Sequence, residues 1–457
     1  MQEWFRESFS QFRRRVAAAL GQRPPDKVFT GCHVLNVFTG EILEQDFGIV
    51  GERIAYLGTP GRHNIGKDTE VIDLKEKIVV PGYFDPHAHT DLYYTPWEFA
   101  RAVASSGTTA IFSDSHDMAN GLGMAGFTEI LSKAKKFPLR FLSGVPLASP
   151  PYPVEGEDLY DREKVRRLLT YKNVIASGSE LTPWVKVIRQ DEVLMEKLFL
   201  VRRTTGRIEG HTVGAKGEKL AALVSAGITS CHESMSLEDV EERLRLGLYV
   251  MLRQGSIRKE FTELSPLLKR YHPRLMLTPD GLFADEIADK GYMDYVLTEA
   301  LRHGGDPVSL IRMATLNPAV YFGLEAHLGG IAPGRLADFN VLEEIGEPRP
   351  LQVWIGGTLV SHPDKGITPG PVSVGEIPSE RPFRIPRLTA ADFSARYPEG
   401  FAGEIPVIDI VNHTVTGVYR WSPSGENDGQ AEPAKDVLKI AMIHREGPGS
   451  GMGIGFV

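Results

Sequence analysis

Cysteine is nearly absent from this chain of 457 residues, which contains Cys32 and Cys231 and no others. Two cysteines cannot build the disulfide framework of a small secreted protein, and they are not spaced to hold a structural zinc ion. The low cysteine content therefore excludes a disulfide-stabilised scaffold and favours a cytoplasmic protein.

Long apolar runs are also missing. Residues 1–21 contain four arginines and two glutamates, and no uninterrupted apolar stretch follows them. This pattern predicts neither a secretory signal nor a membrane span. It favours a surface helix, with an Arg-rich amphipathic transit peptide as the alternative.

An excess of positive charge is lacking as well, because the formal net charge is −8. Nucleic acids and anionic membranes bind to basic surfaces, so the sequence predicts neither as a partner. Phosphate-binding loops and nucleophile elbows are absent. Gly121, Gly123 and Gly126 match a dinucleotide-binding pattern but lie well past the nearest predicted strand, so we interpret them as loop glycines.

The chain does have the composition of a soluble globular protein and a length that predicts two or three domains. Short strands separated by turn residues occupy 26–80 and return at 331–370, so both flanks are predicted to form one small β-sandwich domain. Between them, over 81–330, strand-like and helix-length segments alternate as in a (β/α)8 barrel. Residues 1–25 are predicted to form an N-terminal helix, and 371–457 a partial C-terminal α+β domain.

Within the predicted barrel, the apolar runs serve as strands and the segments between them as helices. The strands include 109–112, 140–142, 173–176, 206–209 and 275–277, and the helices include 237–251 and 307–316. The predicted fold class is therefore α/β.

A His-x-His pair stands where the β domain ends and the barrel is predicted to begin. Side chains repeat every two residues along a strand, so His87 and His89 face the same side. Two imidazoles placed in this way can bind a divalent metal. The pair lies at the C-terminal end of the first barrel strand, which is where the active sites of such barrels are found.

Other ionisable residues follow later strands. His116, His211 and His232 each come just after a predicted strand, and Glu180 is placed to bind one metal or to bridge two. Asp280 is placed as a general base that takes a proton from a metal-bound water and returns it to a leaving amine. This recurrence at strand ends predicts one metal-dependent hydrolytic site.

The chain resembles the amidohydrolase superfamily in the stretch Val-Pro-Gly-Tyr-Phe-Asp-Pro-His-Ala-His at 80–89. It resembles more specifically the bacterial and archaeal adenine deaminase family in Ala-Gly-Ile-Thr-Ser-Cys-His-Glu-Ser at 226–234 and in 244–251. The resemblance covers nearly the whole chain. Further stretches that carry it are 99–103, 107–109, 113–120, 210–211, 311–324 and 330–338.

This resemblance implies a binuclear centre and an activity. His87 and His89 would hold one metal, His211 and His232 the other, and Glu180 would bridge them. Manganese or iron is implied, with zinc as the alternative. Metal-activated hydroxide would convert adenine to hypoxanthine and ammonia, with Asp280 as general base and with Glu233 and His116 in or near the pocket. The family also implies a homodimer.

Several positions near the expected pocket depart from the family pattern. They include Asp91 to Tyr94, Asp117, Leu181 to Pro183, Gln254 and Pro279. Three interpretations therefore stay open. The chain deaminates adenine; it acts on another aminopurine, a pterin or a cyclic amide; or it is a non-catalytic barrel used for binding or assembly.

The C-terminal region ends part-way through the corresponding domain of the family. A separate chain completes that domain, the protein works without the remainder, or the sequence is incomplete. These three alternatives also stay open.

Overall fold

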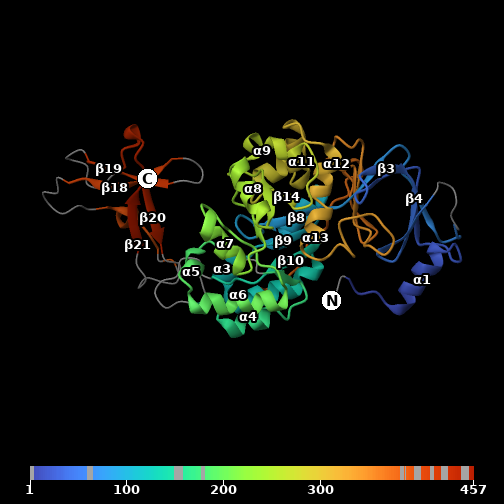
Figure 1. Ribbon diagram of the computed structural model, residues 1–457, viewed down its shortest axis with the longest axis horizontal. Coiled ribbons are helices and arrows are strands. Elements are labelled where there is room, and N and C mark those ends of the chain that lie inside the picture. The colour runs from blue at the N-terminus through green and yellow to red at the C-terminus, as the bar shows by residue number, and fades with distance from the viewer. Residues whose placement is uncertain are drawn as a thin grey trace. The chain divides into compact units, whose positions relative to one another are not determined.

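The computed structural model describes residues 5–58, 65–148, 158–176, 181–380, 385, 387–395, 403–411, 416–423, 431–443 and 452–457. The chain divides into two compact units, Met1–Pro378 and Ser379–Val457. Figure 1 shows the first unit as a group of strands surrounded by helices, with a further set of strands beside α1.

The helices of the described residues all belong to the first unit, apart from short 3-10 turns. None of them is long and apolar enough to cross a membrane. They are α1 (Phe9–Ala19), α2 (Pro96–Ser105), α3 (His116–Lys133), α4 (Arg162–Leu168), α5 (Val185–Ile188), α6 (Glu192–Thr204), α7 (Gly217–Ser225), α8 (Leu237–Arg245), α9 (Phe261–Leu268), α10 (Ala284–Lys290), α11 (Met293–Arg302), α12 (Pro307–Met313) and α13 (Leu316–Tyr321).

The part of the first unit with mixed sheets, which contain antiparallel pairs and two parallel pairs, is built from both flanks of the sequence. One sheet has the order β17-β16-β15-β7-β2-β3 and the other β5-β4-β1-β6. The strands are β1 (Lys27–Thr30), β2 (His33–Asn36), β3 (Glu41–Glu44), β4 (Asp46–Val50), β5 (Arg53–Gly58), β6 (Glu70–Asp73), β7 (Ile78–Pro81), β15 (Phe339–Leu342), β16 (Gln352–Ile355) and β17 (Thr358–Ser361).

Aromatic side chains join these two sheets. Phe29 stacks on Phe47 with ring centroids 4.7 Å apart, and both rings meet Phe339 edge-on. Phe339 lies on β15, which pairs antiparallel with β7. Strands from the two ends of the unit therefore share one apolar core, as the blue and orange ribbons beside each other in Figure 1 indicate.

The parallel strands lie in two sheets, β11-β10-β9-β8 and β12-β13-β14. Thr278 Oγ1 on β14 donates a hydrogen bond to the carbonyl oxygen of His87 on β8, at 2.7 Å, which places the two sheets side by side. The strands are β8 (Tyr83–Ala88), β9 (Thr108–Ser113), β10 (Arg140–Gly144), β11 (Val174–Ala176), β12 (Ser230–Cys231), β13 (Tyr249–Arg253) and β14 (Leu275–Thr278).

Residues alternate along these strands between two apolar clusters. Phe84, Phe112, Met251 and Met276 face one shared interior cluster. Their strand neighbours, such as Leu277, pack into the cluster that contains the covering helices. Because both faces of the strands are buried, the fold of this part is α/β with the helices outside.

The predicted secondary structure of two segments was wrong. The helix predicted over 237–251 ends at Arg245, and 249–253 forms β13 instead, because Gly247 turns the chain with a φ of +85°. Over 206–209 the structure has no strand, and Ile208 alone makes a bridge; its carbonyl accepts a hydrogen bond from Thr229 N at 2.9 Å. Gly206, with a φ of +72°, belongs to the bend that follows α6 and is not extended.

The interpretation of Gly121, Gly123 and Gly126 as loop glycines was also wrong, because all three lie in α3. Gly123 kinks that helix with a φ of +74°. A Cβ atom on Gly126 would stand 2.3 Å from the carbonyl oxygen of Pro378, so this glycine permits a close backbone approach.

The second unit contains two antiparallel pairs, β18 (Ile405–Ile410) with β19 (Thr416–Trp421) and β20 (Lys439–Ile443) with β21 (Met452–Phe456). Its buried core consists of Val407, Trp421, Val437 and Phe456. Helical segments among its described residues are the 3-10 turns Ala390–Phe393 and Pro433–Lys435.

One buried ion pair links the parallel sheets to the mixed sheets. Arg140 on β10 donates two hydrogen bonds to Asp338, both at 3.1 Å.

We expect Arg140→Met to lower the free energy of unfolding by about 3–5 kcal/mol, because it leaves a buried carboxylate without its cation. The control is Arg166→Met in the exposed pair with Glu163, where the change should stay below about 1 kcal/mol. Equal denaturation midpoints for the two variants would contradict this role of Arg140.

Candidate metal centre

Three parallel strands bring imidazoles and a carboxylate together at their C-terminal ends. His87 ends β8 with His89 just beyond it, His232 follows β12, and Asp280 follows β14. The Asp280 Oδ1 atom lies 3.2 Å from His87 Nε2 and 3.1 Å from His89 Nε2. The His87 and His232 rings stack with centroids 4.0 Å apart.

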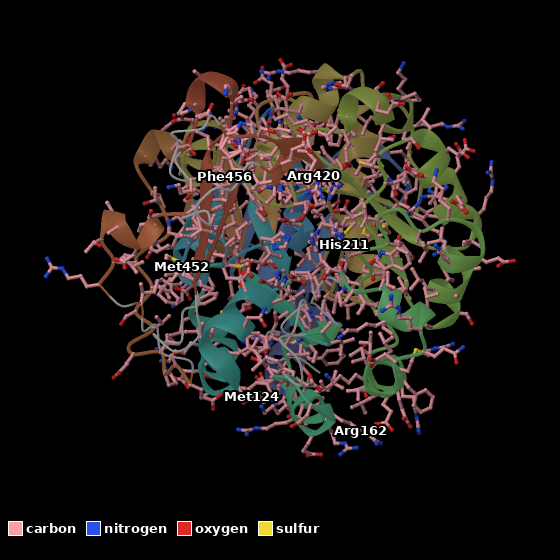
Figure 2. All side chains as sticks on the ribbon, turned by 90° about the vertical axis from the view of Figure 1, so that its left-hand side faces the viewer. Met124, Arg162, His211, Arg420, Met452 and Phe456 are labelled. Carbon is pink, nitrogen blue, oxygen red and sulfur yellow. The ribbon has the colours of Figure 1, made fainter. Side chains whose placement is uncertain are left out.

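A second group adjoins the first through His232. His211 Nδ1 lies 3.1 Å from His232 Nε2, and Glu233 Oε1 lies 3.7 Å from the same His211 nitrogen. In Figure 2, His211 lies toward the middle of the first unit, whereas Arg162 of α4 lies at its edge. Among the described residues, three sets have their potential ligand atoms within 4.8 Å of one another: His87, His232 and Asp280; His211, His232 and Glu233; and His89, Asp114 and His116. His232 belongs to two of these sets.

Glu209 binds the ring nitrogen of His87 that does not face Asp280. Its Oε2 accepts a hydrogen bond from His87 Nδ1 at 3.1 Å, and both side chains are buried. Metal-binding histidines commonly donate the other ring N–H to a carboxylate, which fixes the tautomer and makes the free nitrogen a better ligand. The sequence predicted Glu209 at the end of a strand and gave it no role. Its position two residues before His211 was the available signal.

His116 is the first residue of α3, three residues after β9 ends, and lies beside the first group. Its ring meets the His89 ring edge-on with centroids 5.9 Å apart, and its Nδ1 is hydrogen-bonded to the fully buried carboxylate of Asp114. Ser115 between them has a φ of +58°, a conformation rarely adopted by residues other than glycine. Asp114 orients His116, a role that the sequence pattern did not predict.

Asp280 is held in one orientation. Its backbone has a φ of +51°, and its N–H donates to Thr278 Oγ1 at 3.1 Å. Burial acts to raise the pKa of Asp280, but hydrogen bonds with His87 and His89 outweigh it, so that the pKa lies well below its usual range. The Asp280 side chain is therefore held as an ionised carboxylate.

Glu180 lies outside the described residues, so its bridging role remains a prediction. The donors that are described are imidazole nitrogens and carboxylate oxygens, a set that suits zinc, iron or manganese. The one nearby thiol, Cys231, accepts a hydrogen bond from Thr212 Oγ1 at 2.9 Å. The residues present therefore fit divalent metal binding.

Comparison with known proteins gives a consistent result. Residues 78–360 match the amidohydrolase family. An adenine deaminase of Cenarchaeum symbiosum is 35% identical over 454 residues, which cover 97% of this chain and 74% of that protein. An adenine deaminase of Archaeoglobus fulgidus is 34% identical, covering 95% of this chain and 73% of that protein.

Solved structures share the fold at low sequence identity. The dihydropyrimidinase of Brevibacillus agri superposes with a TM-score of 0.55 at 14% identity, covering 76% of this chain and 97% of that one. The β-aspartyl dipeptidase of Fervidobacterium islandicum gives a TM-score of 0.54 at 17% identity, covering 76% of this chain and 99% of that one.

We expect His232→Ala to weaken binding of Mn²⁺ at least about 10-fold, because His232 belongs to two of the ligand groups. Loss of a residue that only supports a metal ligand already lowers metal affinity by about 10–100-fold. Metal analysis after dialysis measures the effect, and far-ultraviolet circular dichroism checks the fold. His303→Ala is the control, since His303 bonds to Thr262 and to the backbone of Glu299 instead. Unchanged metal content in His232→Ala would contradict the assignment.

Proposed function

This chain belongs to the adenine deaminase family of amidohydrolases, and from this premise we propose that it hydrolyses adenine to hypoxanthine and ammonia. The observation that carries the proposal is a cluster in which the Asp280 carboxylate lies beside His87 and His89, while His232 stacks on His87 and lies 3.1 Å from His211. Such a set is expected of a site that activates water beside a C–N bond.

The proposed centre holds two divalent ions, manganese or iron, with zinc as the alternative. His87 and His89 would bind one ion, His211 and His232 the other, with Glu180 between them. When bound, such ions lower the pKa of a water molecule to about 7, so that hydroxide is available at neutral pH. We also propose that the two parallel sheets belong to one (β/α)8 barrel, which would place all these residues at its C-terminal face.

Asp280 is the proposed general base. Its Oδ1 faces His87 and His89, and its low pKa keeps it ionised at neutral pH. Asp280 accepts a proton from the attacking water and delivers it to the exocyclic nitrogen of adenine. A C6–O bond replaces the C6–N bond, and the nitrogen leaves as ammonia.

Glu233 and His116 are proposed to orient the heterocycle. The Glu233 carboxylate can accept a hydrogen bond from a ring N–H, and it lies at the His211 side of the site. His116, fixed by Asp114, lies at the His89 side. The two residues thus flank the position where the reacting carbon would sit.

Another amino-substituted heterocycle is the second candidate substrate. Two of the positions that depart from the family pattern lie beside the site: Asp117 Oδ1 is 3.4 Å from His116 Nε2, and Asp91 accepts a hydrogen bond from Met118 N at 2.5 Å. Burial raises the pKa of Asp91 to about 6. These changes leave the hydrolytic residues in place and alter the side chains that would line the substrate pocket.

We expect the protein reconstituted with Mn²⁺ or Fe²⁺ to release ammonia from adenine in a panel that also holds substituted adenines, guanine, cytosine and pterins. Hypoxanthine in equal amount identifies the reaction. Release from another member alone would keep the chemistry and replace the substrate. A metal-loaded protein that releases ammonia from none of them would contradict the proposed deamination.

Asp280→Asn should retain metal and lower kcat by about 100- to 10,000-fold, the usual contribution of a general base. The amide keeps the size of the side chain but cannot accept the proton in the same way. Steady-state kinetics together with metal analysis measure both effects. Normal turnover in the variant would exclude Asp280 as the base.

A further inference from the structure

Arg253 is a fully buried cation beside the proposed catalytic residues. It ends β13, and Met251, two residues earlier, faces the interior cluster of the parallel strands. Because side chains alternate along a strand, Arg253 faces the same interior. Its side chain is 0% exposed, so its charge depends wholly on protein partners.

Three carboxylates surround this guanidinium group. Nη1 donates to Asp280 Oδ2 at 2.8 Å and to Glu233 Oε1, and Nη2 donates to Glu233 Oε2 at 3.1 Å. Nε and Nη2 donate to Glu260 Oε1 at 3.2 and 2.5 Å. A guanidinium has five N–H donors, and all five are used here. Arg253 therefore acts on these carboxylates and has no donor left for a substrate.

The two carboxylate oxygens of Asp280 have different partners. Oδ2 is held by Arg253, while Oδ1 faces His87 and His89. Rotation of the carboxylate would break the bond to Arg253. The oxygen that faces the histidines is thereby kept available for proton transfer.

The same guanidinium fixes Glu233. Both carboxylate oxygens of Glu233 bind Arg253, and Oε1 also lies 3.7 Å from His211 Nδ1. Asp280 contacts the His87 and His89 side of the site, and Glu233 the His211 side. One planar group thus sets the separation between two carboxylates that follow different strands, β12 and β14.

Glu260 fixes the plane of the guanidinium from the third side. Burial raises its pKa even though Arg253 stands beside it, so an ionised carboxylate at this position is costly. Arg258 adds a second cation, with Nη2 3.9 Å from Glu233 Oε1. The Glu260 carboxylate accepts hydrogen bonds from Nε and Nη2 of Arg253, so that Nη1 can donate to Asp280 and Glu233.

We propose that Arg253, oriented by Glu260, is a positioning residue that holds Asp280 and Glu233 in the arrangement needed for deamination. The inference rests on the proposed function and adds two residues to it. Lysine cannot replace arginine here, because an ammonium is a point charge without the planar fork that reaches three carboxylates at once.

The test compares the full-length, Mn²⁺-loaded wild type with Arg253→Lys, Glu260→Gln and Arg243→Met. Arg243 is the matched control: it is equally buried, but it bonds to Thr212 and to the Asp239 carbonyl, away from the three carboxylates. Metal per chain, kcat, KM for adenine and the solvent deuterium isotope effect on kcat are measured for each protein.

Arg253→Lys should keep its metal, lose about 100-fold in kcat, and change KM by less than about threefold. Its solvent isotope effect should rise, because proton transfer through a poorly held Asp280 becomes slow. Glu260→Gln should lose about 10-fold in kcat with the same signature. Arg243→Met should lower thermal stability and leave kcat and the isotope effect unchanged.

Two results would overturn the inference. A kcat for Arg253→Lys within about threefold of wild type would show that the arrangement does not need the guanidinium. Loss of metal in proportion to activity would make Arg253 a support of the metal site instead. Failure of the proposed function is separate, since it would appear as a wild type inactive on adenine. In that event, a crystal structure of Arg253→Lys with Asp280 and Glu233 unmoved would overturn the positioning role without any substrate.

Discussion

The structure of this site depends on the pairing of buried carboxylates with cations or hydrogen-bond donors. Glu209, Glu233, Glu260 and Asp280 all have side chains exposed by 9% or less. An isolated buried carboxylate costs several kcal/mol, so each one needs a cation or a set of donors. Arg253 serves three of them, and His87 serves Glu209 and Asp280. Divalent ions would supply the positive charge that these groups still lack.

Asp85 shows the other way to accommodate such a group. It is fully buried, and desolvation raises its pKa to about 6. Tyr292 Oη donates to its Oδ2 at 2.6 Å, and the single hydroxyl hydrogen of Thr278 is shared between its Oδ1 and the His87 carbonyl oxygen, each 2.7 Å from Oγ1. Hydrogen bonds in place of a cation thus tie the strand that carries the histidine pair to the strand that leads to Asp280.

The sequence could predict the residues that follow strand ends, because the C-terminal ends of parallel strands meet on one side of a sheet. His87, His89, His232 and Asp280 come together for this reason, whereas His211 follows a single bridge at Ile208 and no strand. It could not predict the residues that pair with them. Glu209 is 122 positions from His87, and Arg253 looks like the end of an apolar segment. The mistaken helix over 237–251 hid β13 itself, since Gly247 alone marked the change from helix to strand.

The loop that follows Arg253 is locked to the segment that carries Asp280. Gln254 N donates to the Thr278 carbonyl at 3.1 Å, and Ser256 N to the Gly281 carbonyl at 3.2 Å. A Cβ atom on Gly255 would stand 2.1 Å from the Pro279 carbonyl oxygen, so only glycine allows the two backbones to come this close. The left-handed conformation of Asp280 lies within this contact. Strain of that kind persists only where neighbouring groups over-determine it, and here the backbone lock and the Arg253 bond act on the same residue.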